Sequence, residues 1–430
     1  MEPLQIAEGV YDVGVKDWNI RDFHGYSTDL GTTYNAFLIV DEKVTLVDTV
    51  REEFAGQLLD NISRIVDPKK IDYVVSNHTE MDHSGGLARV MHRIGKDKPI
   101  YCSKMGHKNL PRHFSPTWNY HPVATDEELS LGNRTLTFLE TRMIHWPDSM
   151  FSYLNENQIL FSSDGFGQHY AGPEKFDDQI DEATVMHHAK KYFANILLLY
   201  STHIQKLLDK VLDLGLEFKM ICPDHGIIWR KDPQKIIDAY VKWCRQEPQK
   251  KAVIVYDTMW HSTEKMANAI VAGISQEGIG HFFGAVPHGI VYDTMWHSTE
   301  KMANAIVAGI SQEGVTAKPL HLRKWHRSEI MTEIFNARAV VVGSPTLNNQ
   351  LYPSLADFLT YMKGLKPLNK IGAAFGSYGW SGEAVKLINK ELEAMKFEVI
   401  DPGLRIQYVP DKAALETCYE FGRKIGKAVT

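Results

Sequence analysis

A short segment near residue 80 constrains this chain more than any other, because side chains that can bind metal occupy four of its positions. They are His78, Glu80, Asp82 and His83. The apolar run Ile71–Val75 comes just before them and predicts a buried strand that delivers these side chains at its carboxyl end. Gly85-Gly86 then lets the backbone turn sharply into a helix that begins near Leu87. A polar loop with nothing bound is the alternative, but a cation accounts better for ligand-type side chains packed this tightly.

Three later apolar runs lead to ligand-type residues in the same way. These residues are His145, Asp164 and His225. Singly, each has an ordinary explanation as a cap, a turn or a core residue. Four strand ends with the same arrangement favour convergence on one site. Asp148 and Asp224 lie beside two of these residues, and we expect them to orient a His or to cap a turn.

Composition and charge narrow the class of protein. A chain of 430 residues is too long for one core and predicts two or three domains. No apolar run is long enough to span a bilayer, and the N-terminus lacks the regions of a signal peptide, which predicts a cytoplasmic protein. The net charge of −6 argues against nucleic-acid binding. The four cysteines are scattered without a C-x-x-C pair, so we expect buried thiols and no rubredoxin-like module.

The two halves of the chain follow different patterns. Up to residue 249, short strands and helices alternate, and runs 35–40 and 43–48 flank the turn Asp41-Glu42 as a hairpin. This pattern predicts an α/β layered sandwich with much antiparallel pairing. A polar linker broken by Pro248 follows. From residue 250 the order becomes βαβα, which predicts an open parallel sheet with helices on both faces.

Hydroxyl-rich loops follow three strands of the second half. The first contains Thr258, Met259, Trp260, Ser262 and Thr263 before a predicted helix at Lys265–Gln276. Hydroxyls at a helix N-terminus can hold a phosphate, although a Thr-rich cap is the alternative. Two later loops favour a ligand site, because ligands bind at these strand ends, where sheets that resemble flavodoxin hold flavin mononucleotide (FMN). They contain Ser344, Pro345, Thr346 and Asn348, and Ser377, Tyr378, Gly379 and Trp380. Trp260, Tyr378 and Trp380 could cover the flavin ring.

Residues 254–278 recur without a change at 290–314. Chance cannot produce such a repeat, so it reflects a very recent duplication, an engineered feature or an assembly error. We expect only one copy to serve as the first strand and phosphate loop, and the other to be poorly packed. The first copy has the longer strand, and the second leads directly into the next strand at Val315. In the second copy the loop residues are Thr294, Met295, Trp296, Ser298 and Thr299.

The order of the ligand-type residues resembles the metallo-β-lactamase superfamily, whose first motif is H-x-H-x-D-H. Glu80 stands where that motif has its second His, which favours iron over zinc. Together with the segments His145–Met150 and His225–Trp229, this substitution closely resembles the flavodiiron proteins, also called A-type flavoproteins or rubredoxin:oxygen oxidoreductases. The resemblance spans nearly the whole chain.

This resemblance implies a site with two irons. The first iron would bind His78, Glu80 and His145. The second would bind Asp82, His83 and His225, with Asp164 bridging the two ions. Family members vary in whether the residue at position 83 binds directly. His24 matches a second-layer His of the family.

The resemblance also implies a fold and a function. We expect a metallo-β-lactamase-like αββα sandwich at residues 1–249 and a flavodoxin-like doubly wound parallel sheet with FMN at 250–430. The family is built of head-to-tail homodimers that take electrons from a donor such as rubredoxin. They reduce dioxygen to water, nitric oxide to nitrous oxide, or both.

Two alternatives remain open. A dinuclear zinc hydrolase with an appended flavin domain would contain zinc and show esterase or nuclease activity. A non-catalytic flavin electron carrier with a structural metal site would reoxidise slowly under either gas. Glu80 argues against the zinc hydrolase. The occurrence of the full ligand set together with the flavin loops argues against both alternatives.

Overall fold

The computed structural model describes residues 3–23, 25–213, 215–256 and 298–430. It divides into two compact units, Met1–Arg245 and Gln246–Thr430, whereas the sequence suggested a boundary after residue 249. Among the described residues, no helix has the length and apolar character that crossing a membrane requires.

The first unit contains a seven-stranded sheet with the order β1-β2-β7-β8-β9-β10-β11. Its strands are β1 (Leu4–Ala7), β2 (Val10–Asp12), β7 (Phe37–Ile39), β8 (Val44–Val47), β9 (Ile71–Ser76), β10 (Ile100–Ser103) and β11 (Tyr120–Val123). Strands β7 and β8 pair antiparallel, which confirms the predicted hairpin. From β8 to β11 the pairing is parallel, so β9 and β10 end at the same edge of the sheet.

A five-stranded sheet lies against the first. Its strands are β12 (Glu128–Ser130), β13 (Thr135–Glu140), β14 (Met150–Leu154), β15 (Ile159–Phe161) and β16 (Met220–Cys222). Strands β15 and β16 are parallel, because the chain between them crosses over through α5 (Glu182–Tyr192) and α6 (Ser201–Asp213). The helix α7 (Pro233–Cys244) follows β16. Two short pairs complete the unit, β3 (Val15–Asp17) with β6 (Thr32–Tyr34), and β4 (Asp22–Phe23) with β5 (Tyr26–Ser27).

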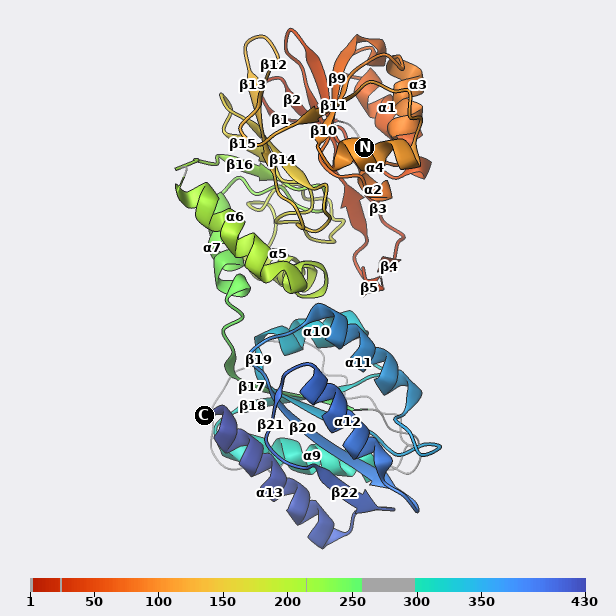
Figure 1. Cartoon of the computed structure of the whole chain (residues 1–430). Coiled ribbons are helices and arrows are strands. Elements are labelled where there is room, and N and C mark those ends of the chain that lie inside the picture. Colours follow the sequence, from red (N-terminus) through yellow and green to blue (C-terminus); the bar gives the residue numbers. More distant parts are fainter. Residues whose placement is uncertain (1–2, 24, 214, 257–297) are drawn as a thin grey trace. The chain divides into compact units, whose positions relative to one another are not determined.

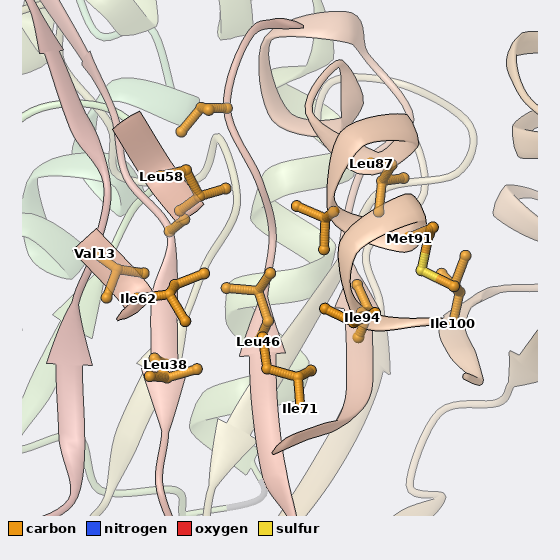
Figure 2. Close-up of a cluster of buried hydrophobic side chains, with 14 of the residues drawn as sticks. Val13, Leu38, Leu46, Leu58, Ile62, Ile71, Leu87, Met91, Ile94 and Ile100 are labelled. Atoms are coloured by element: carbon orange, nitrogen blue, oxygen red, sulfur yellow. The ribbon is translucent and has the colours of Figure 1, made fainter. Parts of the chain in front are cut away.

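Two apolar clusters hold these layers together. One joins the two sheets and includes Phe37, Phe138 and Phe161. The other lies between the first sheet and the helices α1 (Ala55–Ser63), α3 (Leu87–Ile94) and α4 (Gly106–His113). Figure 2 shows Leu87, Met91 and Ile94 of α3 pointing into this second cluster. Helix α6 approaches the outer face of the second sheet, where Val211 shares a hollow with strand residues. The predicted αββα sandwich is confirmed.

The second unit is a parallel sheet with helices between its strands (Figure 1). The strands are β17 (Gln249–Tyr256), β18 (Thr316–His321), β19 (Ala337–Gly343), β20 (Ile371–Tyr378), β21 (Glu398–Val399) and β22 (Leu404–Gln407). The helices are α9 (Ser298–Gln312), α10 (Arg327–Asn336), α11 (Pro353–Leu365), α12 (Glu383–Ala394) and α13 (Lys412–Val429). The order β18-β17-β19-β20-β21 is that of a flavodoxin-like sheet, as predicted. Strand β22, which also pairs with β20, was not predicted because its short run alternates half-buried and exposed residues.

The duplicated sequence contributes to both β17 and α9. Strand β17 takes residues 254–256 from the first copy, and α9 takes its residues from the second. We expected a single copy to serve as the first strand and the phosphate loop. The strand contains residues of the first copy, whereas most loop residues of both copies lie outside the described part of the chain. Ala252 and Val253, which precede the first copy within β17, are fully buried. The second helix leads directly into β18. The expectation of a poorly packed copy concerns residues outside the described part.

Removing residues 257–292 provides a test of this arrangement. The deletion would join Tyr256 to Asp293, so that Tyr256 is followed by the same residues as before, now supplied by the second copy. It would shorten the connection between β17 and α9 from 41 residues to 5. Since a shorter connection loses less entropy on folding, we expect the free energy of unfolding of the second unit to rise by about 1–2 kcal/mol. Thermal unfolding followed by circular dichroism measures this. An insoluble variant, or one that unfolds at a lower temperature, would contradict the expectation.

Candidate metal centre

Four ligand-type side chains form a first group. His78 follows β9, and Glu80 lies two residues further on, before the short helix α2 (Met81–Ser84). The Nε2 atoms of His78 and His145 lie 3.2 and 3.1 Å from Oε2 of Glu80. The same two nitrogens lie 3.4 and 3.3 Å from Oδ2 of Asp164. The two imidazoles and two carboxylates therefore converge on one point.

A second group lies on the other side of Asp164. Helix α2 supplies Asp82 and His83, and His225 follows β16. Oδ2 of Asp82 lies 3.3 Å from Nε2 of His83 and 3.2 Å from Nε2 of His225. Oδ1 of Asp164 lies 3.3 and 3.6 Å from the same two nitrogens. Asp164 therefore turns one oxygen toward each group, which is the bridging position expected from the sequence. All seven predicted side chains are brought together.

His145 reaches the site from a turn rather than from a strand end. The sequence suggested a strand as far as Ile144, but β13 ends at Glu140. Residues 141–149 form a tight turn, in which the backbone N–H of Met143 donates to the carbonyl of Trp146 over 2.7 Å. Ile144 is buried and anchors the turn. Its apolar character made the run look like a continuous strand.

The second ring nitrogens of three histidines face fixed groups behind them. Nδ1 of His78 lies 3.3 Å from Asp148, and Nδ1 of His83 lies 3.3 Å from Asp224. His225 has Nδ1 2.6 Å from the backbone carbonyl of Thr33. The hydrogen bonds of His78 and His225 fix the orientation of these rings and leave Nε2 free to face a metal. Nδ1 of His83 lies close to Asp224 without a hydrogen bond to any described residue. The predicted orienting role of Asp148 and Asp224 agrees with these positions.

Sequence reasoning missed Tyr192 and His169. The hydroxyl of Tyr192 donates to Oδ1 of Asp164 over 2.7 Å, from the last residue of α5. His169 lies 2.8 Å from the hydroxyl of Thr32, and its ring contacts that of His225. No local pattern could have revealed Tyr192, because it lies 28 residues after Asp164. His169 follows Asp164 closely in the chain but belongs to none of the ligand motifs. A π-helical turn at Phe193–Leu197 follows Tyr192, and such turns often occur near functional sites.

The centre concentrates buried negative charge. Six carboxylates lie in or directly behind the two groups. They are Asp48, Glu80, Asp82, Asp148, Asp164 and Asp224. Burial raises the pKa of Asp224, and the nearby charge of Asp48 raises it further. A buried cluster of this kind requires positive charge among its members.

The imidazoles respond strongly to these carboxylates. Burial alone would lower the pKa of His78, but Asp148, Glu80 and Asp164 raise it to about 10. His145 behaves in the same way, with a pKa of about 9. Burial would raise the pKa of Glu80, yet the two histidines lower it to about 2. The histidines lower the pKa values of Asp82 and Asp164 as well, so the three ligand carboxylates hold their charge strongly, as ligands for a cation must.

The geometry fits a pair of cations. Two ligand atoms that each lie about 2.1 Å from one ion are roughly 3.0–3.4 Å apart, which is close to most of the separations above. Within the described part of the chain, Oδ1 of Asp82, Nε2 of His83 and Oδ2 of Asp164 are buried without a hydrogen bond. An ion in each group would satisfy these atoms. The carboxylate-rich donor set suits iron better than zinc.

A second candidate site lies at the carboxyl edge of the parallel sheet. The hydroxyl oxygens of Thr299, in α9, and Ser377, in β20, are 2.8 Å apart. The backbone N–H of Thr346 donates to the carbonyl of Ser377 over 3.0 Å. Ser344 and Pro345 are buried beside them, whereas Trp380 is 86% exposed. Hydroxyls beside a helix N-terminus, next to an exposed aromatic ring, suit a flavin phosphate and ring.

The remaining candidate residues of this edge divide into two sets. Asn348 is exposed in the loop after β19, and Tyr378 and Gly379 are half-buried at the end of β20. Ser298 begins α9. Several predicted residues lie outside the described part of the chain. They are His24, Thr258, Met259, Trp260, Ser262, Thr263, Thr294, Met295 and Trp296.

The fold and the cluster together define a class, a metallo-β-lactamase-like unit with a paired ligand set joined to a flavodoxin-like unit. The family model described as ODP family beta lactamase matches residues 32–226, and the flavodoxin model matches residues 290–422. A nitric oxide reductase of Moorella thermoacetica is 44% identical over 100% of this chain and 99% of its own length.

Two solved structures extend this similarity to the fold. The rubredoxin oxygen:oxidoreductase of Desulfovibrio gigas is 40% identical, with a TM-score of 0.89 over 100% of this chain and 98% of that one. The flavodiiron protein of Giardia intestinalis is 33% identical, with a TM-score of 0.88 over 100% and 97%. The chain therefore belongs to the flavodiiron protein family.

The metal content of the purified protein tests the paired arrangement. We expect about two iron atoms per chain when the protein is produced with iron. Asp164→Ala is expected to lose both, since Asp164 contacts both groups, whereas Glu80→Ala should lose mainly one. Elemental analysis after desalting measures this. Full occupancy in Asp164→Ala would contradict a bridging role.

Proton release on metal loading tests the charge balance. Because carboxylates raise the pKa values of His78 and His145 to about 10 and 9, both rings carry a proton at neutral pH until a cation replaces it. Anaerobic addition of Fe²⁺ to chelator-treated protein should therefore release protons, and binding should strengthen as the pH rises from about 6 to 9. A pH-indicator dye in weak buffer records the release. Binding without proton release would be inconsistent with this charge state.

Proposed function

We propose that this protein is a flavodiiron oxidoreductase that reduces dioxygen to water, nitric oxide to nitrous oxide, or both. The observation that carries the proposal is Asp164, whose two oxygens face the two groups of ligands. A carboxylate in this position can hold two ions close enough for one diatomic molecule to meet both. The relatives named as nitric oxide reductase and as rubredoxin oxygen:oxidoreductase support the same chemistry.

Redox activity distinguishes this function from hydrolysis. The two groups contain three carboxylates, Glu80, Asp82 and Asp164, and such hard ligands favour iron. Two irons, when bound, would supply electrons to the diatomic molecule, which zinc cannot do. A zinc hydrolase with an unrelated flavin unit is therefore the weaker candidate.

The chain's own residues prepare the site in three ways. Asp148 and Asp224 orient His78 and His83 from behind. Tyr192 donates to Asp164 and restricts the rotation of its carboxylate. Burial of the ligands excludes water, since His78, His83 and Asp164 are at most 1% exposed. These contacts would position the ligand side chains before any substrate arrives.

The flavodoxin-like unit would hold FMN and pass electrons to the metal centre. Thr299, Thr346 and Ser377 would hold its phosphate, and Tyr378 and Trp380 would lie beside its ring. We propose a head-to-tail homodimer, in which the flavin of one subunit lies beside the metal centre of the other. An external donor of the rubredoxin type would reduce the flavin, as the name of the Desulfovibrio gigas relative suggests. The four cysteines are free, which suits work in the reducing cytoplasm.

Anaerobic stopped-flow experiments test the function. Protein reduced with dithionite is mixed with dioxygen or with nitric oxide, and flavin absorbance is followed. We expect rapid flavin reoxidation by at least one gas, and a loss of 100-fold or more in Asp164→Ala, since that variant lacks the shared ligand. The FMN content of the variant serves as the control and should stay unchanged, because Asp164 lies in the other unit.

Two outcomes would contradict the proposal. Slow reoxidation by both gases in iron-replete protein would favour a flavin electron carrier. Zinc in place of iron, with esterase or nuclease activity, would favour a hydrolase.

A further inference from the structure

A basic surface covers the helices α3 and α4 of the first unit. Five exposed cationic side chains form it, and we call it the α3–α4 surface. They are Arg89, Arg93, Lys96, Lys108 and Arg112. Residues 84–125 contain seven Lys and Arg residues but a single acidic residue, Asp97. This segment therefore has a net charge of +6 in a chain whose net charge is −6, so the remaining residues carry −12.

The packing of the two helices turns these cations outward. Leu87, Met91 and Ile94 of α3 point into the apolar cluster beneath the helix (Figure 2). Leu110 of α4 belongs to the same cluster. Since both helices bury their apolar faces against one core, their basic side chains face away from it together.

These charges lack partners within the protein. None of the five side chains forms an ion pair or a hydrogen bond with any residue that the structure describes. Other cations of the same unit are paired, such as Arg134 with Asp41 at 3.4 Å and Arg230 with Asp178 at 3.0 Å. Unpaired charges of one sign repel each other, so they add nothing to the stability of the fold. The attraction of a negatively charged partner explains why five unpaired cations lie on one surface.

The α3–α4 surface contains a hollow of about 870 Å³. Arg89, His92 and Lys96 line it along α3, and the indole of Trp118 lines it on the side of α4. Glu52 and Glu53 line it as well, and Arg51 pairs with Glu53 at 2.8 Å. Gly85, which directly follows the helix α2 that carries Asp82 and His83, is another lining residue. The hollow therefore reaches the end of helix α2.

We propose that the α3–α4 surface docks the acidic face of the external electron-donor protein. This inference rests on the proposed function, which requires such a donor. In the head-to-tail dimer, a donor beside α2 of one subunit would lie near the flavin of its partner. A small acidic protein suits the surface better than a nucleic acid, because the charge of −12 on the remaining residues repels a long polyanion. An aromatic residue within a basic surface is also typical of protein interfaces.

Charge reversal tests the docking surface. The probe is a reduced rubredoxin of net negative charge, mixed anaerobically with the iron- and flavin-loaded protein, and flavin reduction is followed at increasing salt. For R89E/K96E and K108E/R112E we expect the second-order rate at low salt to fall tenfold or more and to lose its salt dependence. The matched control is K206E/K210E on α6, which reverses two exposed cations of the same unit and should stay within twofold of the unmodified protein.

The outcomes separate the docking proposal from the proposed function. Reoxidation of dithionite-reduced protein by dioxygen or nitric oxide needs no donor, so its failure would count against the function alone. An unchanged donor-driven rate in both reversal variants would overturn the docking surface, as would an equal loss in the α6 control. Absence of salt-dependent reduction in the unmodified protein would overturn it too. The docking proposal would also be overturned if R89E/K96E lost binding to a DNA duplex while its rate of reduction by rubredoxin stayed unchanged.

Discussion

The shared carboxylate of Asp164 is the interaction on which the rest of the site depends. Its two oxygens lie 3.3–3.6 Å from four imidazole nitrogens, two in each group. Without this residue the two groups would be separate clusters of ligands. With it, they form one centre in which two cations would balance several buried carboxylates. Tyr192 fixes the same carboxylate from α5, so a helix far along the chain takes part in positioning both groups of ligands.

The layered fold explains how so many polar residues can be buried together. Strands β9 and β10 are parallel, and so are β15 and β16. The two strands of each pair therefore end at the same edge of their sheet, where side chains from distant segments meet. Behind the ligands, Asn77 donates two hydrogen bonds of 2.7 Å to Asp48, which ties the end of β9 to the end of β8. Asn35 similarly donates to the carbonyls of Pro223 and Gly226 on either side of His225. Hydrogen bonds of this kind hold the ligand atoms in place more precisely than an unsupported loop could.

The sequence predicted which side chains converge, but not what surrounds them. The ligands His78 to His83 stand together in the chain, and their strand-then-turn setting is a local pattern that can be read directly. The position of Tyr192 depends on how α5 crosses the sheet, and no local pattern encodes that crossing. The strand before His145 was predicted to extend to Ile144, but β13 ends at Glu140. Ile144 is apolar because its side chain is buried in the turn that follows the strand. In the second unit, β17 contains residues of the first copy and α9 contains residues of the second, and identical sequences could not reveal this in advance.

Anomalous diffraction at the iron absorption edge, from crystals of the iron-loaded protein, tests the central claim most directly. We predict two iron peaks per chain, about 3.5–4 Å apart, one on each side of the Asp164 carboxylate. A single peak would contradict it, and so would scattering at the zinc edge alone or peaks away from these seven side chains.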